Sequence, residues 1–422
     1  MNLPLSVEEL KNAVDQFGTP LYIYDESSLN ERCNKLRQLF SGLPVSWLYA
    51  MKANDNPHLL EIISQNRFGL DTVSYEEVLL GLGFTRTPTD IFYTENNMTD
   101  TEMDQAIASG VVLNIGSYSR LEAFCRHPEA KSCCIRINPA IGDGHHEKVD
   151  TGNSESKFGI RKDLIEDCFR LADRHNIRIE GLHVHIGSGI KDPSNMYEAI
   201  NMMLNLANGY ESLEYINFGG GLPVSYHPGD EEFDLQEFEY ITRPLLESFL
   251  NKKNGNFRFY FEPGRWIIAP AGLLLTSVNT VKDQGNKTFL GTDTGFHHLL
   301  RPALYDAYHH IVNISRLDQA EDTRYDIAGN ICESGDLIGI NRDLPESEIG
   351  DLLAILNSGA YGMTMASHYN RRALPAEVLK TESGEFKLIR DRLSPEEQVR
   401  KHLDECKYPD FIESIADNKW DY

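Results

Sequence analysis

The sequence predicts an α/β plus β fold, in which a (β/α)8 barrel is followed by an all-β domain. Between Val45 and Trp266, short apolar runs alternate with amphipathic stretches of helical period. After Ala271, the apolar runs are separated by turns, without regular helices. Alternating strands and helices imply a parallel sheet, and eight such units in this length match a closed barrel better than an open doubly wound sheet.

The predicted barrel strands are the eight apolar runs, each bounded by a polar or glycine-containing turn. They are Val45–Met51, Phe68–Val73, Asp90–Thr94, Val111–Ile115, Ser132–Ile137, Ile179–Ile186, Tyr215–Phe218 and Phe257–Phe261. The helices predicted between them include Pro57–Asn66, Tyr75–Leu82, Thr99–Ala108, Arg161–His175, Asn195–Asn208 and Leu235–Leu250.

The second domain is predicted to form a β-barrel or sandwich. Its predicted strands are Leu273–Val281, Thr288–Thr292, Tyr325–Ala328 and Leu352–Leu356. The extended segment Thr19–Tyr24 precedes the barrel and could pair into this domain, while Ser394–His402 has a helical pattern. Because 422 residues exceed what one hydrophobic core usually organises, we expect two domains, with residues 26–272 forming the barrel and residues 1–25 and 273–422 the β-domain.

Composition and charge exclude several functional classes. Hydrophobic residues make up 41% and charged residues 25%, as in ordinary globular proteins, and no apolar run approaches the length of a membrane span. The 40 basic and 64 acidic residues give a net charge of −24, which argues against a nucleic-acid partner. Seven scattered cysteines without metal-ligand spacing, and an N-terminus without a secretion-signal layout, predict a metal-free cytoplasmic protein.

Polar residues follow the first two predicted strands at their C-terminal ends, where barrel enzymes hold their active sites. Lys52 lies between apolar neighbours at the end of the first strand; burial there is expected to lower its pKa and suit it to form a Schiff base. Asp71 ends the second strand and is expected beside Lys52. The alternatives are that Lys52 merely extends its amine to solvent and that Asp71 caps the next helix.

Glycine-rich segments follow the sixth and seventh strands. His183 and His185 are expected to point to the same side by alternation, and Ser188 lies between two glycines in a segment that can bind an anion. The backbone amides of Gly219–Gly221 can approach a phosphate closely, although three glycines by themselves indicate only a tight turn.

The eighth strand ends with Glu262, followed by Gly264 and Arg265. The acid and the base could form a structural ion pair, but glycine-rich segments after strands seven and eight commonly hold phosphate in barrels. A phosphate site, a lysine and an inward carboxylate together meet the needs of pyridoxal 5'-phosphate (PLP): an anchor, a covalent partner and a group that keeps the pyridine nitrogen protonated.

Two further clusters lie in the predicted second domain. Cys332 and Glu333 place a thiol beside a carboxylate, and Tyr361 lies in the glycine-rich turn Gly359–Gly362. Neither cluster is informative by itself, since a free cysteine is more often a small buried apolar residue than a proton donor.

Seven motifs in order identify a family resemblance that covers about residues 19–388. The sequence resembles the fold type III PLP-dependent decarboxylases, most closely their diaminopimelate branch. The motifs are YAMKAN, HVHIGSG, FGGGL, EPGR, RPALYDAYH, CESGD and GAYGMTMASHYN. The resemblance implies a TIM-like barrel of the alanine racemase type, a homodimer with shared active sites, and conversion of meso-2,6-diaminopimelate to L-lysine and CO2.

The resemblance also implies roles for individual residues. Lys52 would carry PLP, His185 would stack on it, Glu262 would pair with its ring nitrogen, and Cys332 of the partner subunit would act as proton donor. The implied cofactor-binding residues are Lys52, Asp71, Arg136, His185, Ser188, Gly219, Gly220, Gly221, Glu262, Gly264, Arg265 and Tyr361. The implied residues for the distal end of the substrate are Arg265, Arg301, Tyr305, Glu333 and Tyr361.

The sequence departs from the family pattern at His297, His298 and His368, where asparagine or another small polar residue is more usual. These departures leave other amino acids, such as ornithine, lysine, arginine or a carrier-bound residue, as alternative substrates. An amino-acid racemase and a regulatory homologue without PLP are the remaining alternatives. The long glycine-rich segment Gly142–Ser156 is predicted to form a lid over the substrate.

Overall fold

The computed structural model describes residues 3–139, 156–190, 192–253 and 255–408. The chain forms two compact units. Unit 1 consists mainly of the described residues of Asp25–Gly272 together with Gly359–Thr364, and unit 2 contains Leu5–Tyr24, Leu273–Ser358 and residues 365–408.

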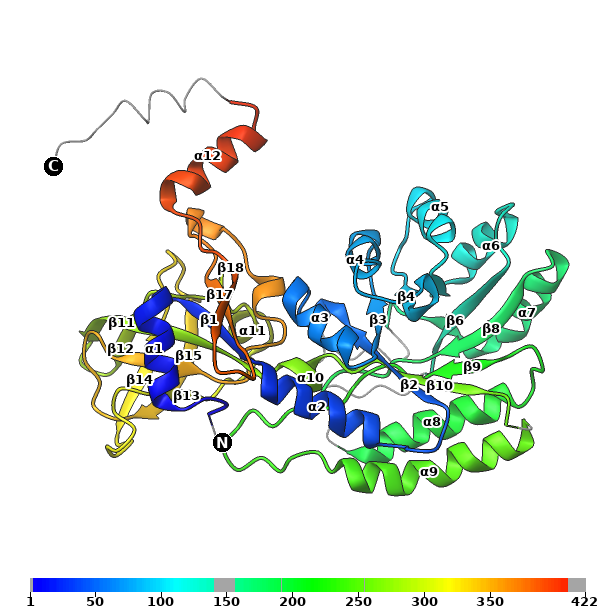
Figure 1. The fold of residues 1–422 in the computed structure, drawn as a ribbon, viewed down its shortest axis with the longest axis horizontal. Helices are drawn as coiled ribbons and strands as arrows, with labels where there is room; N and C mark the ends of the chain where they lie inside the picture. The colour runs from blue at the N-terminus through cyan, green and yellow to red at the C-terminus, as the bar shows by residue number, and fades with distance from the viewer. Residues whose placement is uncertain (1–2, 140–155, 191, 254, 409–422) are drawn as a thin grey trace. The chain divides into compact units, whose positions relative to one another are not determined.

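Unit 1 is a closed barrel of eight parallel strands (Figure 1). They are β2 (Val45–Ala50), β3 (Gly69–Thr72), β4 (Ile91–Thr94), β5 (Val112–Ile115), β6 (Ser132–Asn138), β8 (Arg178–His183), β9 (Tyr215–Asn217) and β10 (Arg258–Phe261). The barrel closes where Phe259 of β10 pairs with Val45 of β2. All eight predicted strands and the predicted barrel are therefore confirmed. The two-residue strand β7 (Ile160–Arg161), which pairs with β6, was not predicted.

Helices surround the barrel strands (Figure 1). They are α2 (Glu26–Gln38), α3 (Pro57–Gln65), α4 (Tyr75–Gly81), α5 (Asp100–Ser109), α6 (Tyr118–Arg126), α7 (Ile165–Arg174), α8 (Pro193–Ala207), α9 (Leu235–Lys252) and the short α10 (Arg265–Ile268). Several begin directly after a strand because a capping residue follows it. The Ser74 hydroxyl, for example, accepts from the Glu77 backbone N–H at 3.2 Å at the start of α4.

The segment Gly359–Thr364 belongs to unit 1 although the sequence-based division placed it in the β-domain. Backbone hydrogen bonds fix it there: the Tyr361 N–H donates to the carbonyl of Ala53 at 2.8 Å, and the Gly359 N–H donates to that of Ala269 at 3.2 Å. A Cβ on Gly359 would lie 2.1 Å from the Ile268 carbonyl oxygen, so only glycine permits this approach. The segment thereby brings Tyr361 to the barrel.

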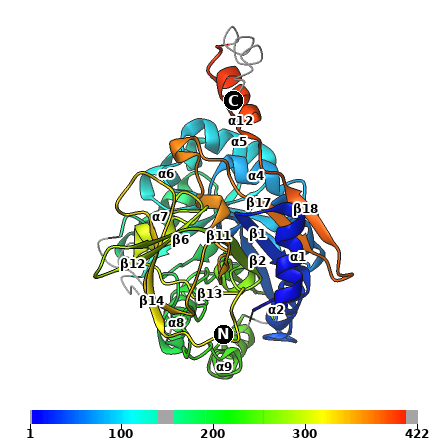
Figure 2. The ribbon, with the colours of Figure 1, turned by 90° about the vertical axis from the view of Figure 1, so that its left-hand side faces the viewer.

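Unit 2 contains a second, mostly antiparallel sheet. Its main strand order is β15-β14-β12-β11-β1-β17-β18, with β16 pairing with β11 and β13. The strands are β1 (Leu21–Asp25), β11 (Gly272–Asp283), β12 (Thr288–Thr292), β13 (Ile311–Asn313), β14 (Thr323–Ala328), β15 (Leu337–Leu344), β16 (Leu352–Ile355), β17 (Ala376–Lys380) and β18 (Phe386–Arg390). β1 enters this sheet between β11 and β17, as the extended segment before the barrel predicted (Figure 2).

The described residues of unit 2 contain three α-helices, of which α11 has only five residues. They are α1 (Val7–Phe17), α11 (Arg301–Tyr305) and α12 (Pro395–Glu405). Within the residues that the structure describes, none of the helices is both long and apolar enough to cross a membrane.

Candidate active site

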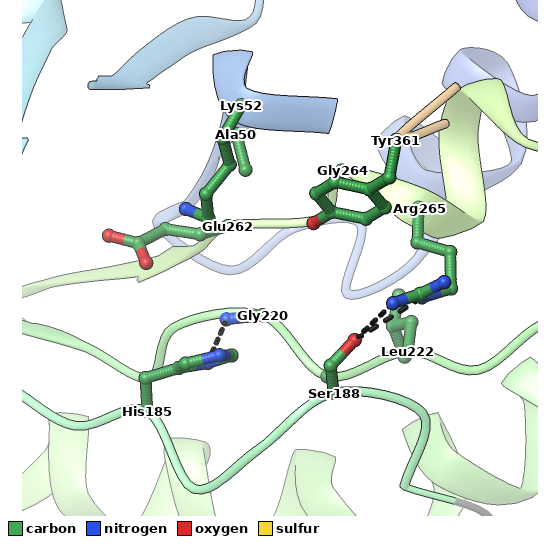
Figure 3. A pocket seen from close by; sticks show the side chains of 11 residues that line it. Ala50, Lys52, His185, Ser188, Gly220, Leu222, Glu262, Gly264, Arg265 and Tyr361 are labelled. Carbon is green, nitrogen blue, oxygen red and sulfur yellow. Dashed lines mark hydrogen bonds between the residues drawn. The ribbon is translucent and has the colours of Figure 1, made fainter. Parts of the chain in front are cut away.

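A pocket in unit 1 lies at the C-terminal ends of the barrel strands (Figure 3). It has about 380 Å³ of free space, counted to its open mouth. Its lining residues are Ala50, Lys52, His185, Ser188, Gly220, Gly221, Leu222, Glu262, Gly264, Arg265 and Tyr361. Nine of the predicted site residues are therefore brought together by the barrel and the Gly359–Thr364 segment.

Lys52 lies in the 3-10 turn Met51–Ala53, directly after β2, and its side chain is 38% exposed. Its Nζ forms an ion pair with Oδ2 of Asp71 at 2.5 Å, and the Asp71 side chain is only 1% exposed. Burial is the largest single influence and disfavours the ammonium charge, but Asp71, Tyr361 and Glu262 together outweigh it, so the pKa of Lys52 lies above its ordinary value. The expectation of a lowered pKa was wrong because it counted burial without the ion pair to Asp71 and the other groups around the amine.

Glu262 follows β10, and both of its carboxyl oxygens have protein partners. The Asn217 side-chain amide donates to Oε1 at 2.6 Å, and Nε2 of His183 lies 3.1 Å from Oε2. Burial, followed by the positive charge of Arg136, holds the pKa of His183 well below its usual value, so the neutral ring donates its Nε2–H to the carboxylate. Burial also raises the pKa of Glu262, although Lys52, Asn217 and Arg136 oppose that shift.

Two glycines bring backbone close to the pocket. A Cβ on Gly219, which has a φ of +70°, would lie 2.4 Å from the Val184 carbonyl oxygen. A Cβ on Gly220 would lie 2.5 Å from the Glu262 carbonyl oxygen. The Gly220 N–H instead donates to Nδ1 of His185 at 3.2 Å, which sets the position of that ring (Figure 3). No side chain fits at either glycine, because each packs closely against the carbonyl of a neighbouring segment at the ends of the strands.

The guanidinium of Arg265 is held from three sides. Its Nε and Nη2 donate to the Ser188 hydroxyl at 3.2 and 3.0 Å (Figure 3). Its Nη1 donates to the Tyr226 hydroxyl at 3.1 Å, and its Cζ lies 4.8 Å from the centre of the Tyr361 ring. The Ser188 oxygen thus accepts two N–H groups of the same guanidinium, which fixes both side chains at the pocket.

The pocket fits PLP for two reasons: its residues match the groups that PLP needs, and two buried polar atoms beside it have no hydrogen-bond partner. Ser188, Gly221 and the backbone of Gly264 and Arg265 line the part of the pocket that can bind a phosphate, Lys52 supplies the amine, and Glu262 supplies a carboxylate. Among the described residues, Oδ1 of Asp71 and Nδ1 of His183 are buried without a hydrogen-bond partner. Buried polar atoms are nearly always paired, so these two point to a polar ligand or water at this position.

Arg136 and Asp71 are not among the lining residues but interact electrostatically with Glu262 and Lys52, which are. Arg136, in β6, is 5% exposed, and its Cζ lies 4.7 Å from the centre of the Phe158 ring. Burial lowers the pKa of Arg136 to about 10, against the attraction of Glu262 and Asp71. Its charge still contributes to keeping His183 and His185 neutral.

The remaining predicted residues belong to unit 2. Cys332 and Glu333 are exposed there, and Tyr305 is half-buried at the end of α11. Arg301 is only 2% exposed, and its Nη1 lies 2.7 Å from Nε2 of His309. The burial of Arg301 within unit 2 was not expected for a residue assigned to a substrate.

Sequence reasoning missed three residues that hold the site. His183 had been paired with His185 by alternation but given no role, and Asn217 and Tyr226 were not singled out. Asn217 is a buried polar residue at the end of β9, a position where a barrel strand presents functional groups. The position of Asn217 at a strand end could therefore have identified it from the sequence. Tyr226 lies in an irregular loop, where residue spacing gives no indication of a functional residue. The predicted lid lies outside the described residues, apart from Ser156.

Comparisons with known proteins agree with this geometry. Residues 26–269 match the family described as pyridoxal-dependent decarboxylase, pyridoxal binding domain. The chain is 40% identical to diaminopimelate decarboxylase of Methanothermobacter thermautotrophicus, with 90% of each chain covered, and 36% identical to that of Aquifex aeolicus, with 94% of each covered.

A solved structure gives the same relationship. The crystal structure of diaminopimelate decarboxylase from Helicobacter pylori complexed with L-lysine has a TM-score of 0.86 and is 30% identical, covering 94% of this chain and all of that one. With its barrel, its pocket and these relatives, the chain belongs to the PLP-dependent decarboxylases.

Proposed function

We propose that this protein decarboxylates meso-2,6-diaminopimelate to L-lysine and CO2, a step of lysine biosynthesis. The observation that carries the proposal is that Lys52, Glu262 and the Ser188–Arg265 pair line the same pocket. It is supported by relatives named diaminopimelate decarboxylase that match over at least 90% of the chain.

In this proposal the pocket residues bind and orient PLP. Lys52 would be its covalent partner, with Asp71 holding the amine; His185 would stack on the ring; and Glu262, fixed by Asn217 and His183, would hold a proton at the pyridine nitrogen. PLP, when bound, supplies the electron sink for loss of CO2. The phosphate would be held by Ser188, Gly219, Gly220, Gly221, the backbone of Gly264 and Arg265, and the Tyr361 hydroxyl, and Arg136 would add positive charge to the cofactor site.

The distal end of the substrate carries both an ammonium and a carboxylate. A zwitterionic terminus needs cations for its carboxylate and an acid for its ammonium, whereas a bare amine needs only the acid. Arg265 and Arg301, with Tyr305 and Tyr361, are assigned to the carboxylate and Glu333 to the ammonium. Two arginines therefore favour diaminopimelate over ornithine or lysine.

The proton donor is proposed to be Cys332 of the partner subunit in a homodimer with shared active sites. The proposal is supported by the exposure of Cys332 and Glu333 on unit 2. Mixing a Lys52→Ala subunit with a Cys332→Ala subunit tests it, because one site of the mixed dimer then has both residues. Restored turnover would support sharing, and a mixture as inactive as its parents would refute it.

A cytoplasmic location is proposed on the state of the cysteines. All seven lie in the described part of the chain, and all are free thiols. Free thiols are typical of a reducing compartment.

The experiment that tests the function measures CO2 release from meso-diaminopimelate, lysine, ornithine and arginine side by side. We expect turnover of diaminopimelate and little from the other three. Preference for ornithine, lysine or arginine would reassign the substrate. A purified protein without a cofactor absorbance band would indicate a regulatory homologue, and racemisation without CO2 release would indicate a racemase.

A further inference from the structure

Unit 2 contains a cluster of residues that the sequence motifs did not connect. Tyr369 and Asn370 are consecutive residues of a 3-10 turn, and they contact the consecutive residues Glu333 and Cys332. The Tyr369 hydroxyl donates to Oε1 of Glu333 at 2.7 Å, and the Asn370 side-chain amide donates to Sγ of Cys332 at 3.0 Å. We call Tyr369 and Asn370 the 369–370 clamp.

The loop that the clamp contacts is anchored by a buried carboxylate. Asp336 is 3% exposed; its Oδ1 accepts from the Phe296 backbone N–H at 2.6 Å, and its Oδ2 accepts from that of Ile331 at 2.7 Å. Phe296 in turn stacks on Tyr369, with ring centres 5.9 Å apart. The exposed thiol and carboxylate are therefore held from a buried anchor on one side and from the clamp on the other.

The backbone of the clamp has an unfavourable conformation. Asn370 has a φ of +53° and Arg371 a φ of +59°, so two successive non-glycine residues are left-handed. Such residues cost free energy and persist where surrounding contacts impose them. The side chain of Arg372 ties the turn to the Cys332 loop, since its Nη2 donates to the Asn330 carbonyl at 3.2 Å. The strain is therefore located where the clamp meets Cys332 and Glu333.

We propose that Asn370 is a positioning residue for proton delivery by Cys332, and that Tyr369 positions Glu333 for the distal ammonium of the substrate. The inference rests on the proposed function, which makes Cys332 the donor. In that step the S–H bond breaks, the proton bonds to the substrate carbon that has lost CO2, and the electron pair stays on Sγ. The Asn370 N–H both directs the thiol hydrogen away from itself and stabilises the negative charge that develops on sulfur.

The test compares variants that tolerate the left-handed backbone. Asn370→Gly removes the donor without steric strain, and Asn370→Asp keeps the shape but replaces the N–H by a negative oxygen. Both are made in a Cys406→Ser background, because Cys332 and Cys406 are the exposed cysteines. Asn341→Gly is the matched control: Asn341 is also exposed and left-handed in unit 2, with a φ of +52°.

Two readouts separate positioning from folding. We expect Asn370→Gly to lower kcat for diaminopimelate by about three- to tenfold, with KM within about twofold, and Asn370→Asp to lower kcat further. Alkylation of Cys332 by iodoacetamide near neutral pH should slow by about three- to tenfold in Asn370→Gly, because less negative charge is stabilised on sulfur. Asn341→Gly should match the background in both measurements.

Tyr369→Phe keeps the ring on Phe296 and removes the hydroxyl. It should raise KM for diaminopimelate by about three- to tenfold and leave kcat within about twofold. Unchanged alkylation and kcat in both Asn370 variants would overturn the assignment of Asn370, and an unchanged KM in Tyr369→Phe would overturn that of Tyr369. Failure of the proposed function is separate: it would appear as full turnover in Cys332→Ser, while the alkylation rates would still report on the clamp.

Discussion

The pocket of unit 1 and the Cys332 loop of unit 2 set the charges of their functional groups in different ways. In the pocket, burial is the largest influence on the pKa values of Lys52, Glu262 and His183, and partners then modify it. Beside the exposed loop, in the 369–370 clamp, the pKa of Tyr369 is raised first by its hydrogen bond to Glu333. The fold of the pocket thus sets the charge states of its residues by burying them. At the exposed loop, the charge states depend on single hydrogen bonds.

The largest effect is expected at the centre of the pocket. Lys52→Ala should lower turnover on the order of 10³-fold or more, because it removes the covalent amine and leaves Asp71 buried without its ion-pair partner. The cofactor absorbance of the covalent form should also disappear. Borohydride reduction of the wild type followed by peptide mapping checks the site, and trapping of PLP on a different lysine would rule out this assignment.

A smaller effect is expected from neutralising the carboxyl group that Asn217 and His183 hold. Glu262→Gln should keep PLP bound but lower kcat by about 10²-fold or more, because an uncharged partner no longer holds a proton on the pyridine nitrogen and the ring becomes a poorer electron sink. Cofactor content measured beside kcat separates chemistry from binding. Near-normal turnover at full cofactor content would contradict the role.

A substitution of Arg301 tests whether a cation buried in unit 2 can bind the distal carboxylate of the substrate. Removing one cation from a desolvated carboxylate costs about 2–5 kcal/mol, so Arg301→Ala should raise KM for diaminopimelate about 30-fold or more. Lysine lacks the distal carboxylate, so its slow turnover should change much less. Because Arg301 is 2% exposed and contacts His309, the melting temperature should also fall.

The effect of Arg301→Ala on diaminopimelate, compared with its effect on lysine, decides between a substrate-binding and a structural role for Arg301. A selective loss with diaminopimelate supports substrate binding. An equal loss on both amino acids, with dissociation of the dimer, would make the arginine structural and would remove a main support for the diaminopimelate assignment.

The fold was predictable where burial imposes a recognisable pattern of apolar residues along the sequence. The eight barrel strands are nearly continuous apolar runs because a parallel sheet is covered on both faces. The strands β13, β15, β17 and β18 were not predicted; in β18 most residues are exposed or half-buried, so no apolar alternation marks it. The two-residue strand β7 is too short to carry any period. Prediction therefore worked well in the barrel and less well in the second sheet.

The site was predictable where it follows strand ends, and less so where it depends on distances. Lys52, Asp71 and Glu262 were located from strand ends, but the raised pKa of Lys52 depends on an ion pair whose strength no spacing reveals. The contact between Asn370 and Cys332 joins two loops 38 residues apart, and no periodicity encodes it.

The smallest predicted effect concerns stability, and it tests whether burial controls charge near the pocket. Glu77, in α4, accepts from the Val73 backbone N–H at 2.8 Å, and burial raises its pKa from 4.5 to about 7. The folded state therefore binds a proton more tightly than the unfolded state does. Stability from this group is fully present below about pH 4.5 and is lost as the pH rises through about 7.

Glu77→Gln remains neutral at every pH and can still accept from Val73. Above pH 7 the variant should be more stable than the wild type by about 1–2 kcal/mol, a value reduced for partial exposure, with a melting temperature about 2–6 °C higher. The difference should shrink as the pH falls toward 4.5. Glu76→Gln, an exposed neighbour on the same helix, controls for the loss of a carboxylate. If both variants show the same melting profile across this range, burial does not set the charge of Glu77, and the contrast between a pocket governed by burial and a loop governed by single contacts would not hold at this position.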